Sequence, residues 1–145
     1  MRVDFYQLSE SPAEAALPLI ARATLNAGER LLVVSSDSDQ LDRISDALWT
    51  RLPATFLAHG RFGEGQDNAQ PILLSGDAIP ANEARFLAIA DGVWRDSEAL
   101  FQRTFYMFDD ASLQPARECW RMLGKREGVD RRFWKQQGGK WVEGP

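Results

Sequence analysis

The sequence contains a single cysteine, Cys119, and a single histidine, His59, among its 145 residues. One cysteine cannot form an intramolecular disulfide, and no nearby residues give Cys119 the spacing of a metal site, so a reducing cytoplasm is the expected compartment. One histidine excludes sites built from paired imidazoles, and a lone histidine at a strand end is more often structural than catalytic. We therefore expect no resident metal and no cofactor.

Long apolar runs are also missing, because no window approaches about 18 apolar residues. The opening stretch MRVDFYQLSES has no basic segment followed by an apolar one, so neither export nor a membrane span is expected. A composition of 44% hydrophobic and 26% charged residues is ordinary for a globular protein. We expect one domain spanning residues 1–145.

The net charge of −4 hides an uneven distribution. Residues 112–145 contain eight of the seventeen Lys and Arg, only four of the twenty-one Asp and Glu, and three of the five tryptophans. Fields of opposite sign guide different partners to different faces of a small molecule. This distribution indicates that the basic C-terminal segment and the acidic remainder meet different partners.

Strand and helix patterns alternate along the chain. VDFYQL alternates apolar and polar residues, RLLVVS is a continuous apolar run typical of a buried strand, and a polar helix start follows each of them. Leu41, Ile44, Leu48 and Trp49 fall on one side of the second helix. The expected N-terminal elements are a strand at 3–8, a helix from Ser9–Pro12 to Gly28, a strand at 30–35, and a helix from residues 36–39 to Pro53.

The rest of the chain, from residue 55 on, begins with short strand candidates separated by polar, glycine-bearing loops. The expected elements are strands at 55–59, 71–74, 86–90 and 104–108, a short helix at 97–103, a helix at 112–127, and a hairpin or extended strand with a turn at 131–143. Alternation of this kind predicts an α/β fold: a single domain with a mostly parallel open sheet and helices on both faces. A mixed α+β sheet is the alternative.

Signatures of enzyme chemistry are largely absent. The first strand-to-helix turn, QLSESPAE, contains neither GxGxxG nor GxxxxGK[ST], and Glu10 would repel a phosphate, so the topology is Rossmann-like without a nucleotide-binding loop. The aspartates of residues 37–46 could hold a divalent cation, but helix capping and a solvated helix face are the favoured interpretation. Cys119, inside a helix, is more typical of core packing than of a nucleophile. We expect no catalytic residues.

The helix at 112–127 presents a mixed aromatic and basic face. Arg117, Trp120, Arg121 and Lys125 share this face, while Leu113, Ala116, Cys119 and Leu123 can form the buried stripe beneath it. An indole beside cations suits an acidic peptide tail, and it equally suits single-stranded nucleic acid. In the alternative interpretation the tryptophan packs in the core and solvated basic residues cover it.

Four segments are informative together: VDFYQL, GERLLVVSSD, DALWTR ending in TFLAHG, and SLQPARECWR. They cover most of the chain, and in this order they resemble the chi subunit family of bacterial DNA polymerase III holoenzyme. Residues 61–101 match only loosely, and the tail WKQQGGKWVE is a feature of some members rather than all.

This resemblance implies a non-catalytic adaptor in the clamp-loader assembly, at the replisome on the nucleoid. One surface would bind the psi subunit, and through it the clamp loader. Another would bind the acidic C-terminal tail of single-stranded DNA-binding protein, so that contact with DNA is mostly indirect. Transferred by position, the tail site would draw on Arg117, Trp120 and Arg121, with Lys125 nearby and with Trp49 and Phe56 as its apolar wall. Trp120 stands where other members carry tyrosine, and Gln114 where a lysine can occur.

The psi surface and two alternative functions complete the expectations. The resemblance implies an apolar psi surface elsewhere on the sheet, for which Trp94, Leu100 and Phe101 are the candidates, although ordinary core burial explains them equally well. A direct single-stranded nucleic-acid-binding protein is the alternative function, supported by the basic, tryptophan-rich C-terminus. A degenerate nucleotide-handling enzyme is a third hypothesis, and the first turn argues against it.

Overall fold

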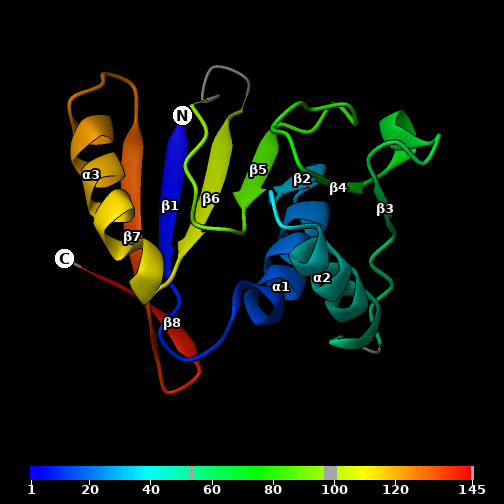
Figure 1. Ribbon diagram of the computed structural model, residues 1–145, viewed down its shortest axis with the longest axis horizontal. Helices are drawn as coiled ribbons and strands as arrows, with labels where there is room; N and C mark the ends of the chain where they lie inside the picture. The colour runs from blue at the N-terminus through cyan, green and yellow to red at the C-terminus, as the bar shows by residue number, and fades with distance from the viewer. Residues whose placement is uncertain (53, 97–100, 145) are drawn as a thin grey trace.

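A computed structural model describes residues 1–52, 54–96 and 101–144. Its elements form one eight-stranded sheet with helices on both faces (Figure 1). They are β1 (Arg2–Gln7), α1 (Ala13–Asn26), β2 (Leu31–Val34), α2 (Ser38–Thr50), β3 (His59–Arg61), η1 (Asp67–Ala69), β4 (Ile72–Ser75), β5 (Phe86–Ile89), β6 (Arg103–Phe108), η3 (Asp110–Ser112), α3 (Leu113–Gly124), β7 (Asp130–Gln137) and β8 (Lys140–Glu143).

The strands follow the order β3-β4-β2-β5-β6-β1-β7-β8 across the sheet. The neighbours from β3 to β7 pair in parallel, and β8 pairs antiparallel with β7. The predicted α/β class, with its mostly parallel open sheet, is therefore confirmed, and the mixed α+β alternative is wrong. None of the helices within the described residues has the length and apolar character needed to cross a membrane.

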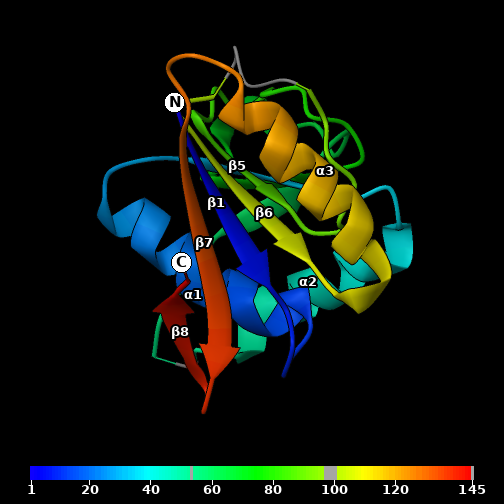
Figure 2. The ribbon, with the colours of Figure 1, turned by 90° about the vertical axis from the view of Figure 1, so that its left-hand side faces the viewer.

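Side-chain alternation along the strands divides the core into two layers. Val33 and Tyr6 face the layer covered by α1 and α2, whereas Val34 and Phe5 face the layer covered by α3. The two layers lie on opposite faces of the sheet, and α3 is separated from α1 by the strands (Figure 2). A residue on α2 and a residue on α3 therefore serve different faces of the molecule.

The C-terminal hairpin is fixed to the first strand-to-helix turn. Gly138 and Gly139 form its turn with φ values of 57° and 78°, a conformation that favours glycine. The side-chain oxygen of Gln136 accepts hydrogen bonds from the backbone N–H groups of Ser9 (2.9 Å) and Glu10 (2.8 Å). In nucleotide-binding proteins of this fold, the backbone N–H groups of the same turn hold a phosphate. Here the Gln136 side chain takes up these N–H groups instead.

Two details differ from the sequence expectations, and two others fall wholly or mainly outside the described residues. The strand expected at 55–59 is wrong: Thr55 N–H bonds to Leu52 O in a turn, and β3 begins only at His59, where the chain pairs with Ile72. The helix expected at 112–127 ends at Gly124, because Lys125 caps it. The short helix expected at 97–103 lies mainly outside the described residues, and Arg103 already belongs to β6. Pro53, the expected helix end, also lies outside the described residues.

The aspartates at the start of α2 cap the helix. Asp37 is the N-cap, and its side chain accepts a hydrogen bond from the N–H of Asp39 (3.0 Å). Asp42 forms an ion pair with Arg61 on β3. Within the described ranges no group of three or more His, Cys, Asp and Glu has the arrangement of a metal site. These contacts favour the capping interpretation over a cation site.

Candidate functional site: an aromatic and cationic pocket beneath α3

Helix α3 is held by its first residues and by one buried stripe. Asp109 and Ser112 form a reciprocal capping box just before the helix, with bonds of 3.0 and 3.1 Å between backbone N–H groups and side-chain oxygens. The predicted stripe is confirmed for Ala116, Cys119 and Leu123, which are buried. Leu113, also predicted for the stripe, is only partly buried. With this stripe facing the sheet, Arg117 and Arg121 remain exposed.

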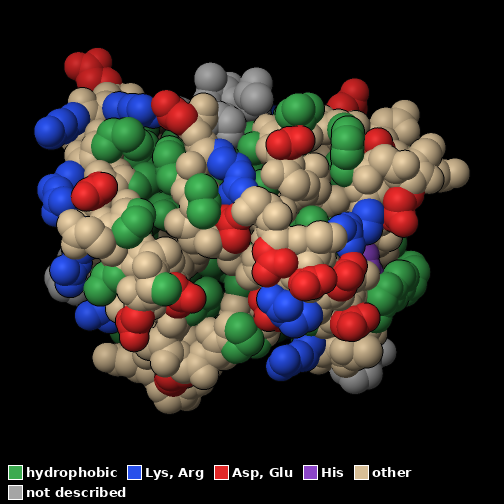
Figure 3. All heavy atoms as spheres, in the orientation of Figure 1, with side chains coloured by type: hydrophobic (Ala, Val, Ile, Leu, Met, Phe, Trp, Pro, Cys, Tyr) green, Lys and Arg blue, Asp and Glu red, His purple; other side chains and the backbone are tan. Residues whose placement is uncertain are grey.

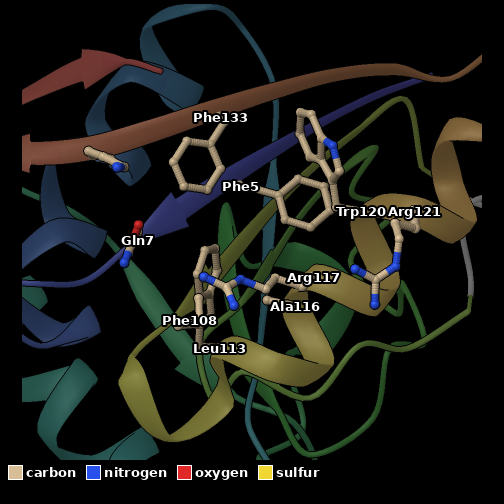
Figure 4. A pocket seen from close by; sticks show the side chains of 10 residues that line it. Phe5, Gln7, Phe108, Leu113, Ala116, Arg117, Trp120, Arg121 and Phe133 are labelled. Carbon is tan, nitrogen blue, oxygen red and sulfur yellow. The ribbon is translucent and has the colours of Figure 1, made fainter. Parts of the chain in front are cut away.

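A pocket of about 350 Å³ opens between α3 and the strands β6, β1 and β7. Its floor follows the register of the sheet, because Phe5 pairs with Phe133, and Gln7 pairs with both Phe108 and Lys135. In Figure 4 the Phe5, Phe133 and Trp120 rings gather together, and Arg117 extends from α3 near Phe108. The lining residues are Phe5, Gln7, Phe108, Leu113, Ala116, Arg117, Trp120, Arg121, Phe133 and Lys135.

Trp120 combines the two roles that the sequence left as alternatives. Its ring packs edge-on against Phe5 at 5.0 Å and against Phe133 at 6.2 Å between centroids, so it is docked on the core. It also lines the pocket. The Arg131 guanidinium lies 4.1 Å from its ring centroid and donates a hydrogen bond to its carbonyl oxygen at 2.6 Å. These contacts hold the indole in place before any ligand arrives.

The cations of the pocket are available for a ligand. In the described part of the chain, Arg117 and Arg121 form neither an ion pair nor a side-chain hydrogen bond, and the same holds for Lys135. Lys and Arg side chains line the left-hand edge of the molecule in Figure 3, where α3 and β7 lie. Lys125, which the resemblance places near this site, is exposed but does not line the pocket. An aromatic floor beside unpaired cations suits a ligand that carries both a ring and a carboxylate.

The structure does not bring Trp49 and Phe56 to this pocket. They lie on α2 and in the segment after it, at the β3 edge of the sheet and on the side opposite α3. The expectation that they form the apolar wall of the α3 pocket is therefore wrong in geometry. Trp49 follows the buried Leu48 by one residue, a rotation of about 100° around the helix, so it points away from the buried stripe.

Trp49 and Phe56 instead form an exposed aromatic pair. Trp49 is 50% exposed and Phe56 is 76% exposed, with 5.6 Å between their ring centroids. Trp49 also contacts the His59 ring at 4.5 Å. His59 itself is occupied structurally, since its ring nitrogens lie 2.8 Å from Ser45 Oγ and 2.9 Å from Leu57 O.

Of the three residues suggested for psi, the two that the structure describes do not form an exposed patch. Phe101 is 4% exposed and belongs to the core layer beneath α3. Trp94 is partly buried and packs against Tyr106 with 5.5 Å between ring centroids. Leu100 lies outside the described residues. Core burial, the alternative given for Phe101 from the sequence, is the arrangement found.

The Cys119 thiol is buried in α3. Burial raises the pKa of the Cys119 thiol to about 12, and the charge of Asp96 adds to the increase. The thiol is therefore protonated near neutral pH, and Cys119 serves as a buried packing residue of α3.

Fold and site together define a Rossmann-like α/β protein that lacks a nucleotide-binding loop and has an aromatic and cationic pocket beneath α3. The chain belongs to the DNA polymerase III chi subunit family, because the family model described as DNA polymerase III chi subunit, HolC, matches residues 1–132. It is similar to DNA polymerase III subunit chi of Escherichia coli (strain K12), at 27% identity over 117 residues, covering 77% of this chain and 78% of that protein. The resemblance of the sequence motifs is thus confirmed, and with it a role in DNA replication as part of a polymerase holoenzyme.

Sequence reasoning missed the strand half of the pocket. Phe5, Gln7 and Phe108 come from β1 and β6, and Phe133 and Lys135 from β7. The alternation of each strand indicates which residues share a face, but only the pairing of β1 with both β6 and β7 brings them together.

Proposed function

We propose that this protein is a non-catalytic adaptor that connects the psi subunit, and through it the clamp loader, to the acidic C-terminal tail of single-stranded DNA-binding protein. It would act in the bacterial cytoplasm, at the replisome. The observation that carries the proposal is the α3 pocket, in which an aromatic floor lies beside cations that have no partner in the described chain. The family role in replication supports it.

The pocket matches the chemistry of such a tail. A tail that ends in phenylalanine presents a ring and a free carboxylate at one position. The partly buried Phe133 and Trp120, which pack on the buried Phe5, offer ring surface to the ligand, and the Arg117 guanidinium offers two parallel N–H donors for the carboxylate. Aspartates upstream in the tail need further cations, which Arg121 and Lys135 supply.

The arrangement of tryptophans disfavours direct binding of single-stranded nucleic acid. Trp134 and Trp141 pack against Tyr6, at 6.2 and 4.9 Å between ring centroids, in the layer on the α1 face. Trp120 lies on the α3 face. The three tryptophans of the basic segment therefore form no continuous strip on which successive bases could stack.

A comparison of ligands tests the function. The labelled peptide Asp-Asp-Asp-Ile-Pro-Phe, a scrambled peptide of the same composition, and a fluorescent oligothymidine are titrated separately against the protein at two salt concentrations. We expect micromolar binding of the ordered peptide, weakened by salt, and weaker binding of the other two ligands. Tighter binding of oligothymidine than of the ordered peptide would overturn the adaptor proposal in favour of the nucleic-acid alternative.

An adaptor needs a second surface that stays open while the first is occupied. We propose that the exposed Trp49–Phe56 pair binds psi. Its support is that both rings are solvent-exposed and lie at the far edge of the sheet from the α3 pocket. Buried aromatic anchors carry a large share of interface free energy, so an exposed aromatic pair is a suitable contact.

The double variant Trp49→Ala/Phe56→Ala is expected to weaken psi binding at least tenfold, about 1.4 kcal/mol, and to leave tail binding unchanged. Ile79→Ala is the matched control, because Ile79 is 60% exposed and lies between β4 and β5, away from the aromatic pair in the sequence. Calorimetric titration with purified psi and with the tail peptide gives both affinities. Loss of tail binding with psi binding intact would return these residues to the tail site.

A further inference from the structure

Strand β7 contributes a wall of the pocket that α3 does not provide. Alternation along β7 places Arg131, Phe133 and Lys135 toward α3, and the last two line the pocket. Phe133 lies beside Phe5 and Lys135 beside Gln7 in the parallel register. Both residues come after the segment that matches the family model, which ends at residue 132.

Lys135 is available to an incoming ligand. Its side chain is exposed and lines the pocket, and its ammonium nitrogen lies 5.9 Å from the Phe133 ring centroid. No acidic side chain pairs with it in the described chain. Arg117 approaches the pocket from α3 instead. The floor therefore has cations on two walls contributed by different elements.

Arg117 and Lys135, on the two walls, differ in how they bind anionic groups. A guanidinium binds a carboxylate in a fixed bidentate geometry, whereas an ammonium on a flexible stem acts as a point charge toward several anionic groups. A ligand whose ring lies on Phe133 and Trp120, with its terminal carboxylate at Arg117, can place the preceding residues along the β7 wall.

We propose that Lys135 is a specificity-determining residue that recognises the acidic residues preceding the terminal carboxylate of the bound tail, while Arg117 holds the carboxylate itself. This inference rests on the proposed tail-binding function. It assigns to the C-terminal strand, outside the family match, the discrimination between acidic and neutral tails.

The test crosses three peptides with three proteins. The peptides are the acidic tail, the same tail with its aspartates replaced by asparagine, and the acidic tail with an amidated C-terminus. The proteins are the wild type, Lys135→Met, and Lys140→Met as a control that removes the same charge from exposed β8. Fluorescence anisotropy measures each affinity.

Lys135→Met is expected to weaken the acidic tail roughly three- to fivefold, to weaken the amidated tail by the same factor, and to leave the asparagine tail unchanged. Lys140→Met is expected to match the wild type. Equal losses for the acidic and asparagine tails, a loss for the acidic tail but none for its amidated form, or equal effects of both lysine variants would each overturn the assignment. Failure of the wild type to bind any tail would instead refute the proposed function.

Discussion

Replacing Arg117 by alanine is expected to weaken binding of the acidic tail peptide at least tenfold, about 1.4 kcal/mol. Arg117 is exposed and has no ion partner in the described chain, so its removal leaves the fold intact and affects only the ligand. A bidentate guanidinium–carboxylate pair is among the stronger polar contacts in proteins, and its loss leaves the carboxylate against an apolar floor.

Two further variants sharpen this result. Arg117→Lys keeps the charge but loses the paired N–H donors of the guanidinium, and we expect an affinity between those of the wild type and Arg117→Ala. Arg22→Ala removes an exposed, unpaired arginine from α1 on the other face, so it controls for net charge alone. If Arg117→Ala and Arg22→Ala reduce affinity equally in isothermal titration calorimetry, long-range charge rather than the pocket binds the tail.

Replacing Asp4 by alanine is expected to lower the free energy of unfolding by about 2–4 kcal/mol, a large share of the roughly 5–15 kcal/mol that stabilises a typical domain. The Asp4 side chain is fully buried in β1. It accepts hydrogen bonds from Arg2 (2.9 Å), Arg103 (2.8 Å) and the Trp134 indole (3.0 Å). Alanine leaves two neighbouring guanidinium groups and a partly buried indole N–H without their acceptor.

The same carboxylate connects β1 to both of its neighbours, since Arg103 lies on β6 and Trp134 on β7. Asp4→Asn retains one acceptor and is expected to cost less than Asp4→Ala. Asp46→Ala, at an exposed position of α2, is the control and is expected to change stability by less than about 0.5 kcal/mol. Urea unfolding measures all three variants, and a loss for Asp4→Ala no larger than that of the control would contradict this role.

The sequence predicted the fold well because its strongest patterns are local. The apolar run of β2, the capping aspartate of α2 and the glycine pair of the hairpin each act within a few residues. The strand expected at 55–59 is wrong because Leu57, although buried, lies in an irregular segment outside the strand ladder, which begins at His59. Burial alone does not distinguish these two environments.

The candidate site was predictable only in its helical half. Arg117, Trp120 and Arg121 share a helix face, which spacing reveals directly. Phe5 and Phe133 are separated by most of the chain, and they meet because β1 lies between β6 and β7. Trp49 was assigned to the same pocket by resemblance, yet the sheet separates it from α3. Strand order, which decides both cases, is a long-range property that local patterns do not encode.

The most direct test of the tail-binding pocket uses the indole N–H signals of the five tryptophans, which a two-dimensional NMR spectrum of ¹⁵N-labelled protein resolves and single tryptophan variants assign. On addition of the acidic tail peptide we predict a shift of the Trp120 signal that saturates with the binding isotherm, while the Trp49 signal stays in place. A saturating shift of Trp49 with Trp120 unchanged would contradict the account and place the tail at the opposite edge of the sheet.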